Sequence, residues 1–345
     1  MVSSPPTVER NPPKQKTGIH PRPNDRGLLR RRIKDNMVSK MDILGTGLSG
    51  LVGSRIIELL SNEGYDFEDL SFDKGVDITK FDQVLKRFSK SKARIVLHLA
   101  AKTDVDGCEK DKEEDIKRLR NKEIKKFDGL NTAWVINVEG TRNVILAAKK
   151  TRKKVIYVST DFVFDGVKGF YNEDDIPNPI NWYGQTKYEG EKIVKESGLS
   201  FLICRIAYPY RAKFVPKKDF FRSILEKLKE GEKVFSLTDH IFTPTFIDDI
   251  TYAVKMLIKK QSSGIYHVVG DQFLTPFEAV TIIADKFGLD RKMVISAKMD
   301  EYYAGRAPRP LKLALKNDKI EKLGVKMSTL SEGLEKIKKY LILNN

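Results

Sequence analysis

The segment that decides the fold is Met41-Asp-Ile-Leu-Gly-Thr-Gly-Leu-Ser-Gly-Leu-Val-Gly53. Its first four residues have the apolar content of a short buried strand, and residues 49–61 repeat apolar side chains at helical spacing. The glycines between them fit GxGxxG from Gly45 and GxxGxxG from Gly47. Glycines in such a turn let backbone N–H groups approach a pyrophosphate at the helix N-terminus. The segment therefore predicts a dinucleotide-binding strand–turn–helix unit.

Predicted strands and helices alternate beyond this turn. Strands are expected at 66–72, 93–101, 154–159 and 200–206, and helices at 81–88, 133–150 and 183–197. This alternation is typical of a doubly wound parallel α/β sheet, the Rossmann type. We expect that domain over residues 39–207, completed by part of 232–265. Helices expected near 218–230, 247–260, 275–287 and 331–341 predict a smaller α/β lobe, mainly 208–345, that binds the substrate.

The formal net charge of +16 on 345 residues suggests an anionic partner when it is taken alone. Residues 1–40 hold ten basic and three acidic residues, and six of the fourteen prolines lie before residue 39. We therefore expect residues 1–38 to be a disordered basic extension. No aromatic residue interleaves its charges, so we expect no nucleic-acid binding. Residues 109–128 carry nearly balanced charges, which predicts a solvated helix.

The remaining composition indicates a cytoplasmic protein. Cys108 and Cys204 form neither a disulfide framework nor a CxxC motif, which fits a reducing compartment. The four histidines lack the spacing of metal ligands, so no metal site is expected. No apolar run approaches the roughly 20 residues of a membrane span, and the N-terminus lacks a secretory apolar region.

A second motif, Tyr183-Gly-Gln-Thr-Lys187, follows Ser159-Thr-Asp161. Positions i and i+4 share one face of a helix, so Tyr183 and Lys187 can face the same substrate. A neighbouring ammonium stabilises a phenolate, which predicts a lowered pKa for Tyr183 and a role as acid or base. Thr160 lies at the carboxyl end of a predicted strand, where its hydroxyl can bond a substrate oxygen that gains charge.

The cofactor preference depends on the residue after the second strand. Asp73 follows Gly53 by twenty residues, at the expected end of that strand. An acid there can bind the adenosine ribose hydroxyls and disfavour a 2′-phosphate, which favours NAD over NADP. Lys74 opposes this by attracting such a phosphate, so NAD(H) and NADP(H) both stay open.

Eight segments of the chain resemble the motifs of a known family and follow one another in the same order. They are ILGTGLSGLVG at 43–53, VDIT at 76–79, HLAAKTDVDGCE at 98–109, NVEGTRN at 137–143, VSTDFVFDG at 158–166, YGQTKYEGE at 183–191, DHIFTPT at 239–245 and RPLKLAL at 309–315. Together they resemble the extended short-chain dehydrogenase/reductases that act on nucleotide sugars, and within them the dTDP-4-dehydrorhamnose reductase (RmlD-like) family. The likeness covers about residues 41–340.

The resemblance implies a role for each matched position. The implied catalytic residues are Thr160, Tyr183 and Lys187. The implied cofactor-binding residues are Gly47, Leu48, Ser49, Gly50, Leu51, Val52, Gly53, Asp73, Asp77, Ile78, Ala100, Ala101, Lys102, Tyr183 and Lys187. Asp104 and Asp161 would lie near the sugar. For the substrate diphosphate we add Arg222, Arg306 and Arg309, because a guanidinium offers a fork of donors.

The implied reaction is NAD(P)H-dependent reduction of the C4 ketone of a 4-keto-6-deoxy nucleotide sugar. Two alternatives stay open: a nucleotide-sugar epimerase of the same fold, and a non-catalytic regulatory subunit that resembles the methionine adenosyltransferase β subunit. A homodimer is left open too. Three departures from the family pattern put the exact substrate in question. Lys102 replaces an aromatic residue, His240 a glutamine and Phe242 a glycine.

Overall fold

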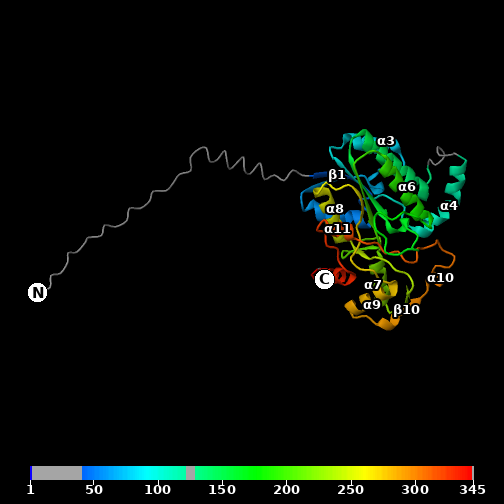
Figure 1. The fold of residues 1–345 in the computed structure, drawn as a ribbon, viewed down its shortest axis with the longest axis vertical. Helices are drawn as coiled ribbons and strands as arrows, with labels where there is room; N and C mark the ends of the chain where they lie inside the picture. Colours follow the sequence, from blue (N-terminus) through cyan, green and yellow to red (C-terminus); the bar gives the residue numbers. More distant parts are fainter. Residues whose placement is uncertain (2–40, 122–128, 344–345) are drawn as a thin grey trace. The chain divides into compact units, whose positions relative to one another are not determined.

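Six parallel strands form the central sheet of the computed structural model, which describes residues 1, 41–121 and 129–343 (Figure 1). The strands are β1 (Met41–Thr46), β2 (Tyr65–Asp69), β3 (Ile95–His98), β4 (Lys154–Thr160), β5 (Phe201–Ile206) and β9 (Gly264–His267). Their order is β2-β1-β3-β4-β5-β9, which confirms the doubly wound fold. The chain reverses its direction of winding between β1 and β3. Ligands of such sheets bind outside the carboxyl ends of the strands at that point.

Two layers of helices cover the sheet, because neighbouring strand residues point to opposite faces. Ile43 packs with one core, where α2 (Leu51–Ser61) meets α8 (Ile247–Lys259). The next residue, Leu44, packs with the other, which includes residues of α3 (Phe81–Lys90), α5 (Thr141–Lys150) and α6 (Trp182–Glu196). Both faces of the sheet are thus buried, as expected for parallel strands.

The later elements build a separate hydrophobic cluster. It combines residues of α7 (Phe220–Lys229), α9 (Pro276–Phe287) and α12 (Leu330–Leu343) with those of two short parallel pairs. One pair is β7 (Val234–Leu237) with β10 (Val294–Ala297), and the other is β6 (Pro209–Tyr210) with β8 (Thr245–Phe246). Figure 1 shows α7, α9, β10 and the short α10 (Met299–Tyr302) gathered together. The remaining short helix, α11, spans Asp318–Glu321. The exact domain boundary near residue 207 stays a prediction.

Four local predictions need correction or completion. The second strand ends at Asp69, and residues 72–74 form a 3₁₀ turn. The expected strand at 93–101 is confined to Ile95–His98. The helix expected at 133–150 contains a π-helical turn, Val135–Gly140, before α5. The charged block lies mostly in α4 (Val105–Arg120), whose Asp115 is buried and accepts a hydrogen bond from the Trp182 indole N–H at 2.8 Å.

Two predictions fall on parts of the chain that the structure does not place. The basic extension at 2–38 and the end of the charged block at 122–128 lie outside the described residues. Within the described ranges, no helix has both the length and the apolar character needed to cross a membrane.

A buried ion pair joins α6 to the sheet. The Arg205 guanidinium donates to both Glu191 oxygens at 2.9 and 2.7 Å, and the two side chains are 2% and 0% exposed. The same guanidinium lies 4.9 Å from the centre of the Phe164 ring and 3.4 Å from His267 Nε2. Removing one member leaves the other charge buried without compensation.

We predict that Arg205→Met lowers the free energy of unfolding by about 3–5 kcal/mol. Lys192→Met is the matched control, because its pair with Glu189 is partly exposed, and we expect a loss below about 1 kcal/mol. Denaturant unfolding monitored by circular dichroism measures both. Similar losses in the two variants would contradict the importance given to the buried pair.

Candidate active site

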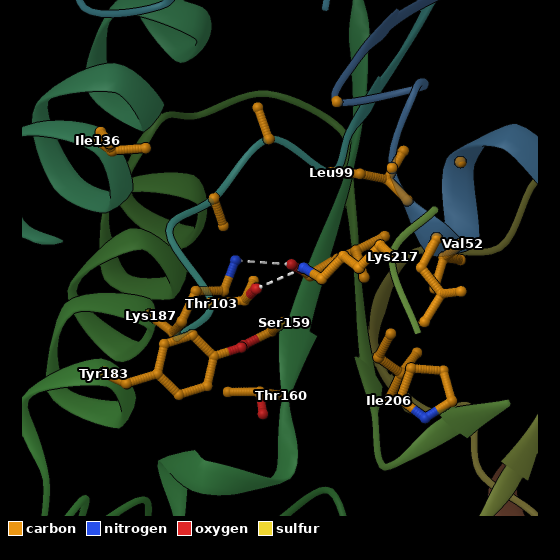
Figure 2. Close-up of a pocket in the computed structure, with 18 of the residues that line it drawn as sticks. Val52, Leu99, Thr103, Ile136, Ser159, Thr160, Tyr183, Lys187, Ile206 and Lys217 are labelled. Carbon is orange, nitrogen blue, oxygen red and sulfur yellow. Dashed lines mark hydrogen bonds between the residues drawn. The ribbon is translucent and has the colours of Figure 1, made fainter. Parts of the chain in front are cut away.

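A cavity of about 680 Å³ opens at the carboxyl ends of β1, β3 and β4. Its wall combines the glycine turn, the loop after β3, the end of β4, one face of α6 and residues of the later elements. Figure 2 shows Tyr183 and Lys187 projecting from one helix toward Ser159 and Thr160. The topology alone predicts a ligand site here.

Two glycines of the turn, Gly47 and Gly53, have no room for a side chain. Gly47 has φ +66°, and a Cβ built on it would lie 2.5 Å from the Ala100 backbone nitrogen. A Cβ on Gly53 would lie 2.6 Å from Leu48 Cα. Gly50 precedes the first residue of α2 and lines the cavity. A tight turn with backbone N–H groups at a helix N-terminus fits the pyrophosphate of a dinucleotide.

Most of the predicted cofactor residues line this cavity. They are Gly47, Ser49, Gly50, Leu51, Val52, Gly53, Asp77, Ile78, Ala100, Ala101, Tyr183 and Lys187. Leu48 does not, because its side chain is buried in the core beneath the turn. Asn143 of α5 holds the loop at 77–79 by donating to the carbonyls of Ile78 and Thr79, both at 3.0 Å. Sequence reasoning missed this positioning role of Asn143.

Asp73 lies elsewhere than predicted. It sits in the 3₁₀ turn after β2, is exposed, and is not part of the cavity wall. The acid at the strand end is Asp69, which accepts hydrogen bonds from the backbone and hydroxyl of Ser71 at 2.9 and 2.5 Å. Ser71 in turn accepts from the Ser49 backbone at 3.1 Å. Asp73 is therefore not placed to select NAD over NADP.

Lys102 also departs from its predicted place. Its ammonium donates to Asp111 at 2.6 Å and to the Asn131 carbonyl at 3.2 Å, and it does not line the cavity. Asn137, in the π-helical turn, exchanges hydrogen bonds with the Lys102 backbone at 2.8 and 3.0 Å. Asn137 also donates to Thr186 of α6 at 3.0 Å. The π turn thus ties the loop after β3 to the helix that carries Tyr183 and Lys187.

The three predicted catalytic residues share the cavity. Thr160 ends β4, and its hydroxyl bonds Asp161 Oδ1 at 2.8 Å. Tyr183 and Lys187 are buried one helical turn apart on α6. The Lys187 ammonium donates to the Val158 carbonyl at 2.8 Å and lies 4.1 Å from the centre of the Tyr157 ring.

Burial is the main cause of the shifted pKa values of Tyr183 and Lys187. Desolvation raises the pKa of Tyr183 above its ordinary value, although Thr160 opposes the rise, so the predicted lowering is wrong for this structure. Desolvation also lowers the pKa of Lys187 to about 7, against the opposing effect of Glu191. Near neutral pH Tyr183 therefore keeps its proton, while Lys187 is near its titration point.

Asp161 supplies a second titratable group. Burial raises its pKa to about 7, opposed by its hydrogen bond with Thr160. Asp161 Oδ2 and Ser159 Oγ are buried and have no hydrogen-bond partner among the described residues. Both residues line the cavity. Buried polar atoms without partners are costly, so their position here indicates that a polar ligand completes the site.

The residues predicted to bind the substrate diphosphate and the sugar divide into two groups. Arg309 lines the cavity, but it donates to Asp106 at 2.5 Å. Arg306 also binds Asp106, and Arg222 binds Glu226; neither lines the cavity. Asp104 is exposed and precedes α4 outside the wall. Of the predicted substrate residues, only Asp161 and Arg309 therefore face the cavity.

Sequence reasoning missed several residues of the cavity wall. Tyr208, Lys217, Phe220 and Tyr303 line it together with Thr103. Tyr208 has φ +40°, a conformation that is uncommon for a bulky residue, and this outlier marks a constrained position. Its hydroxyl lies 3.3 Å from His240 Nε2. An isolated aromatic residue in a loop carries no motif that could have identified it.

The model of one family, the RmlD substrate binding domain, matches residues 41–122 and 128–342. The chain belongs to this family. A relative of this RmlD-family chain, the probable low-salt glycan biosynthesis reductase Agl14 of Haloferax volcanii, is 30% identical over 84% of this chain and 94% of its own. A dTDP-4-dehydrorhamnose reductase of Aggregatibacter actinomycetemcomitans is 27% identical over 86% and 98%. Subunit beta of methionine adenosyltransferase 2 of Bos taurus is 27% identical over 90% of each chain.

Solved structures agree with this placement in the RmlD family. The dTDP-4-dehydrorhamnose reductase of Bacillus anthracis, in complex with NADP, has a TM-score of 0.76 and 30% identity, covering 87% of this chain and 99% of its own. A hypothetical dTDP-4-dehydrorhamnose reductase of Sulfolobus tokodaii has a TM-score of 0.69 and 30% identity, covering 85% and 99%. The resemblance read from the eight motifs is confirmed.

We predict that Lys187→Met makes the ligand-free protein more stable at neutral pH, by about 1–2 kcal/mol. The folded pKa of Lys187 is about 7, below its ordinary 10.5, so the unfolded chain binds more protons between these values. Burial of Lys187 thus costs stability fully below about pH 7, and the cost fades as pH rises to 10.5. Denaturant unfolding at pH 6 and pH 9 measures the difference, which should shrink at pH 9. A variant less stable than the parent at pH 6 would refute this reading.

Proposed function

We propose that this RmlD-family protein reduces the C4 ketone of a 4-keto-6-deoxy nucleotide sugar with NADPH or NADH. The observation that carries the proposal is one cavity that joins the glycine turn to Thr160, Tyr183 and Lys187. The likeness to the dTDP-4-dehydrorhamnose reductases of A. actinomycetemcomitans and, in complex with NADP, of B. anthracis supports this reaction class. The buried unpartnered oxygens of Ser159 and Asp161 support a polar substrate beside this group.

The chain's own residues hold the dinucleotide and move a proton. The backbone of the turn at 47–53 would hold the pyrophosphate, and the loop at 77–79 would border the adenine. A nicotinamide dinucleotide supplies the hydride when it is bound. Tyr183 donates its phenolic proton to the alkoxide oxygen that reduction leaves, and Lys187, when charged, stabilises the resulting phenolate.

Thr160 orients the substrate carbonyl. Its hydroxyl has one hydrogen, which bonds Asp161 when Asp161 is ionised. When Asp161 is protonated, Asp161 becomes the donor, and the Thr160 hydrogen is free to bond the carbonyl oxygen. The pKa of Asp161, about 7, places this exchange in the neutral range.

Tyr183→Phe should abolish the oxidation of NADPH and NADH by dTDP-4-dehydrorhamnose, with a loss of about a thousandfold or more in kcat, because the variant lacks the proton donor. Absorbance at the nicotinamide band follows the reaction, and product analysis identifies the new alcohol. Tyr188→Phe is the matched control, since Tyr188 lies on the same helix outside the cavity wall and should react like the parent.

Each of three other outcomes would contradict part of this proposal. Retained turnover by Tyr183→Phe would refute the assigned proton donor. An altered sugar with no net consumption of NADPH or NADH would identify an epimerase. No reaction of the parent protein with any 4-keto nucleotide sugar would refute the reductase.

The pH dependence of kcat/KM tests the protonation states that this mechanism requires. The proton of Tyr183, the charge of Lys187 and a protonated Asp161 all favour reduction, so kcat/KM should be constant below about pH 7 and fall above it. Steady-state rates between pH 5.5 and 9 measure this. The Asp161→Asn variant keeps a hydrogen-bond donor to Thr160 at every pH. If kcat/KM of this variant still falls above pH 7, the fall is due to Lys187. If kcat/KM no longer falls, the fall in the parent is due to Asp161. A rate that rises through neutral pH would contradict the mechanism.

A second candidate function is a non-catalytic subunit. It is favoured by the likeness to subunit beta of methionine adenosyltransferase 2 of B. taurus, which spans 90% of both chains. This function predicts binding of NADP without turnover of any keto sugar. The assay above therefore separates the two candidates.

A further inference from the structure

The loop at 211–219, between β6 and α7, is anchored by hydrogen bonds at both of its ends. Asp219 accepts a hydrogen bond from the Arg211 backbone at 3.0 Å and another from the Arg222 backbone at 2.8 Å. The buried Arg211 side chain donates to the Leu51 carbonyl at 3.1 Å and to Ser54 Oγ at 2.8 Å. The loop is thereby fixed to α2, the helix that follows the glycine turn.

Arg222 supports this loop from within. Its guanidinium donates to the Val215 carbonyl at 2.8 Å and lies 4.3 Å from the centre of the Phe214 ring. Glu226 compensates its charge at 2.9 Å. The residue that sequence reasoning assigned to a phosphate is thus occupied in holding the loop that borders the cavity.

Three lysines of the loop have different partners. Lys213 pairs with Glu58, and Lys218 pairs with Glu226. Lys217 instead donates to the neutral hydroxyl of Thr103 at 3.0 Å. Lys217 and Thr103 both line the cavity, as do Tyr183 and Lys187, and Figure 2 shows the bond between Lys217 and Thr103.

The other two cations among the described residues that line the cavity, Arg309 and Lys187, are compensated or buried. Arg309 is 8% exposed and binds Asp106. Lys187 is buried deep in the site with a pKa lowered to about 7. Lys217 is an exposed ammonium, and its recorded partner carries no charge. An anion in the cavity therefore gains more from Lys217 than Thr103 does, because the ammonium attracts an opposite charge in addition to donating a hydrogen bond.

We propose that Lys217 leaves Thr103 and binds the diphosphate of the nucleotide-sugar substrate, which makes it a residue that selects nucleotide-linked sugars. This inference rests on the proposed function. The dinucleotide also carries a pyrophosphate, but the glycine turn and the N-terminus of α2 already supply donors for that group. Lys217 belongs to the later elements, beside Phe220 and Tyr208 on the cavity wall.

The test is a calorimetric titration of dTDP, and separately of UDP, into the full chain saturated with NADP⁺. We expect Lys217→Gln to weaken binding of the preferred diphosphate about tenfold, the effect of losing one charge-assisted hydrogen bond. Lys217→Arg should restore most of the affinity. Lys218→Gln is the matched control, because Lys218 is the next residue, pairs with Glu226 and does not line the cavity. Its affinity should change less than about twofold.

The titration needs no turnover, so its result is separate from that of the reductase assay. A Lys217→Gln variant that binds dTDP and UDP like the parent would overturn the inference even if reduction is observed. A variant that loses affinity for NADP⁺ and keeps that for dTDP and UDP would overturn it too, since the charge would then serve the dinucleotide. A parent protein that binds neither diphosphate would also refute it.

Discussion

The close approach of two backbone turns at the switch point is the constraint on which the site depends. Gly47, after β1, stands against the Ala100 backbone after β3, where any Cβ would overlap at 2.5 Å. That contact lets the N-terminus of α2 and the loop after β3 share one cavity. Asn137 then ties the same loop to α6 through Lys102 and Thr186. The glycine turn and α6 are therefore joined through the loop after β3, by a backbone contact on one side and by the Asn137 side chain on the other.

The burial of Lys187, which the proposed function requires in this cavity, carries a cost in stability. Lys187 is buried with a backbone carbonyl and the face of Tyr157 as its neighbours, and this desolvation brings its pKa to about 7. Glu191, one turn further along α6, opposes that shift, while its own charge is compensated by Arg205 of β5. The buried pair of Glu191 and Arg205 thus lies one helical turn from Lys187, whose charge the proposed reaction uses. Such tension between burial and charge is frequent at functional sites.

The sequence allowed prediction of those features whose cause is local. The glycine turn and the i, i+4 pair on α6 are set by residues a few positions apart, and the structure places both as expected. Side chains whose partners come from distant segments were not predictable. Lys102 faces Asp111 instead of the cavity, and Arg309 faces Asp106 on α4. Lys217 could not be separated from Lys213 and Lys218 without knowing that their partners are Glu58, Glu226 and the neutral Thr103.

The departures from the family pattern act on the cavity indirectly. Phe242 is buried in the cluster of the later elements and does not line the cavity; its ring centre lies 4.7 Å from that of Tyr208. His240 donates from Nδ1 to the Leu311 carbonyl at 3.0 Å, so its Nε2 is free to accept from the Tyr208 hydroxyl at 3.3 Å. Burial lowers the pKa of His240, which keeps it neutral and able to accept. His240 and Phe242 therefore both contact the side chain of Tyr208, so two of the three departures converge on one residue of the cavity wall.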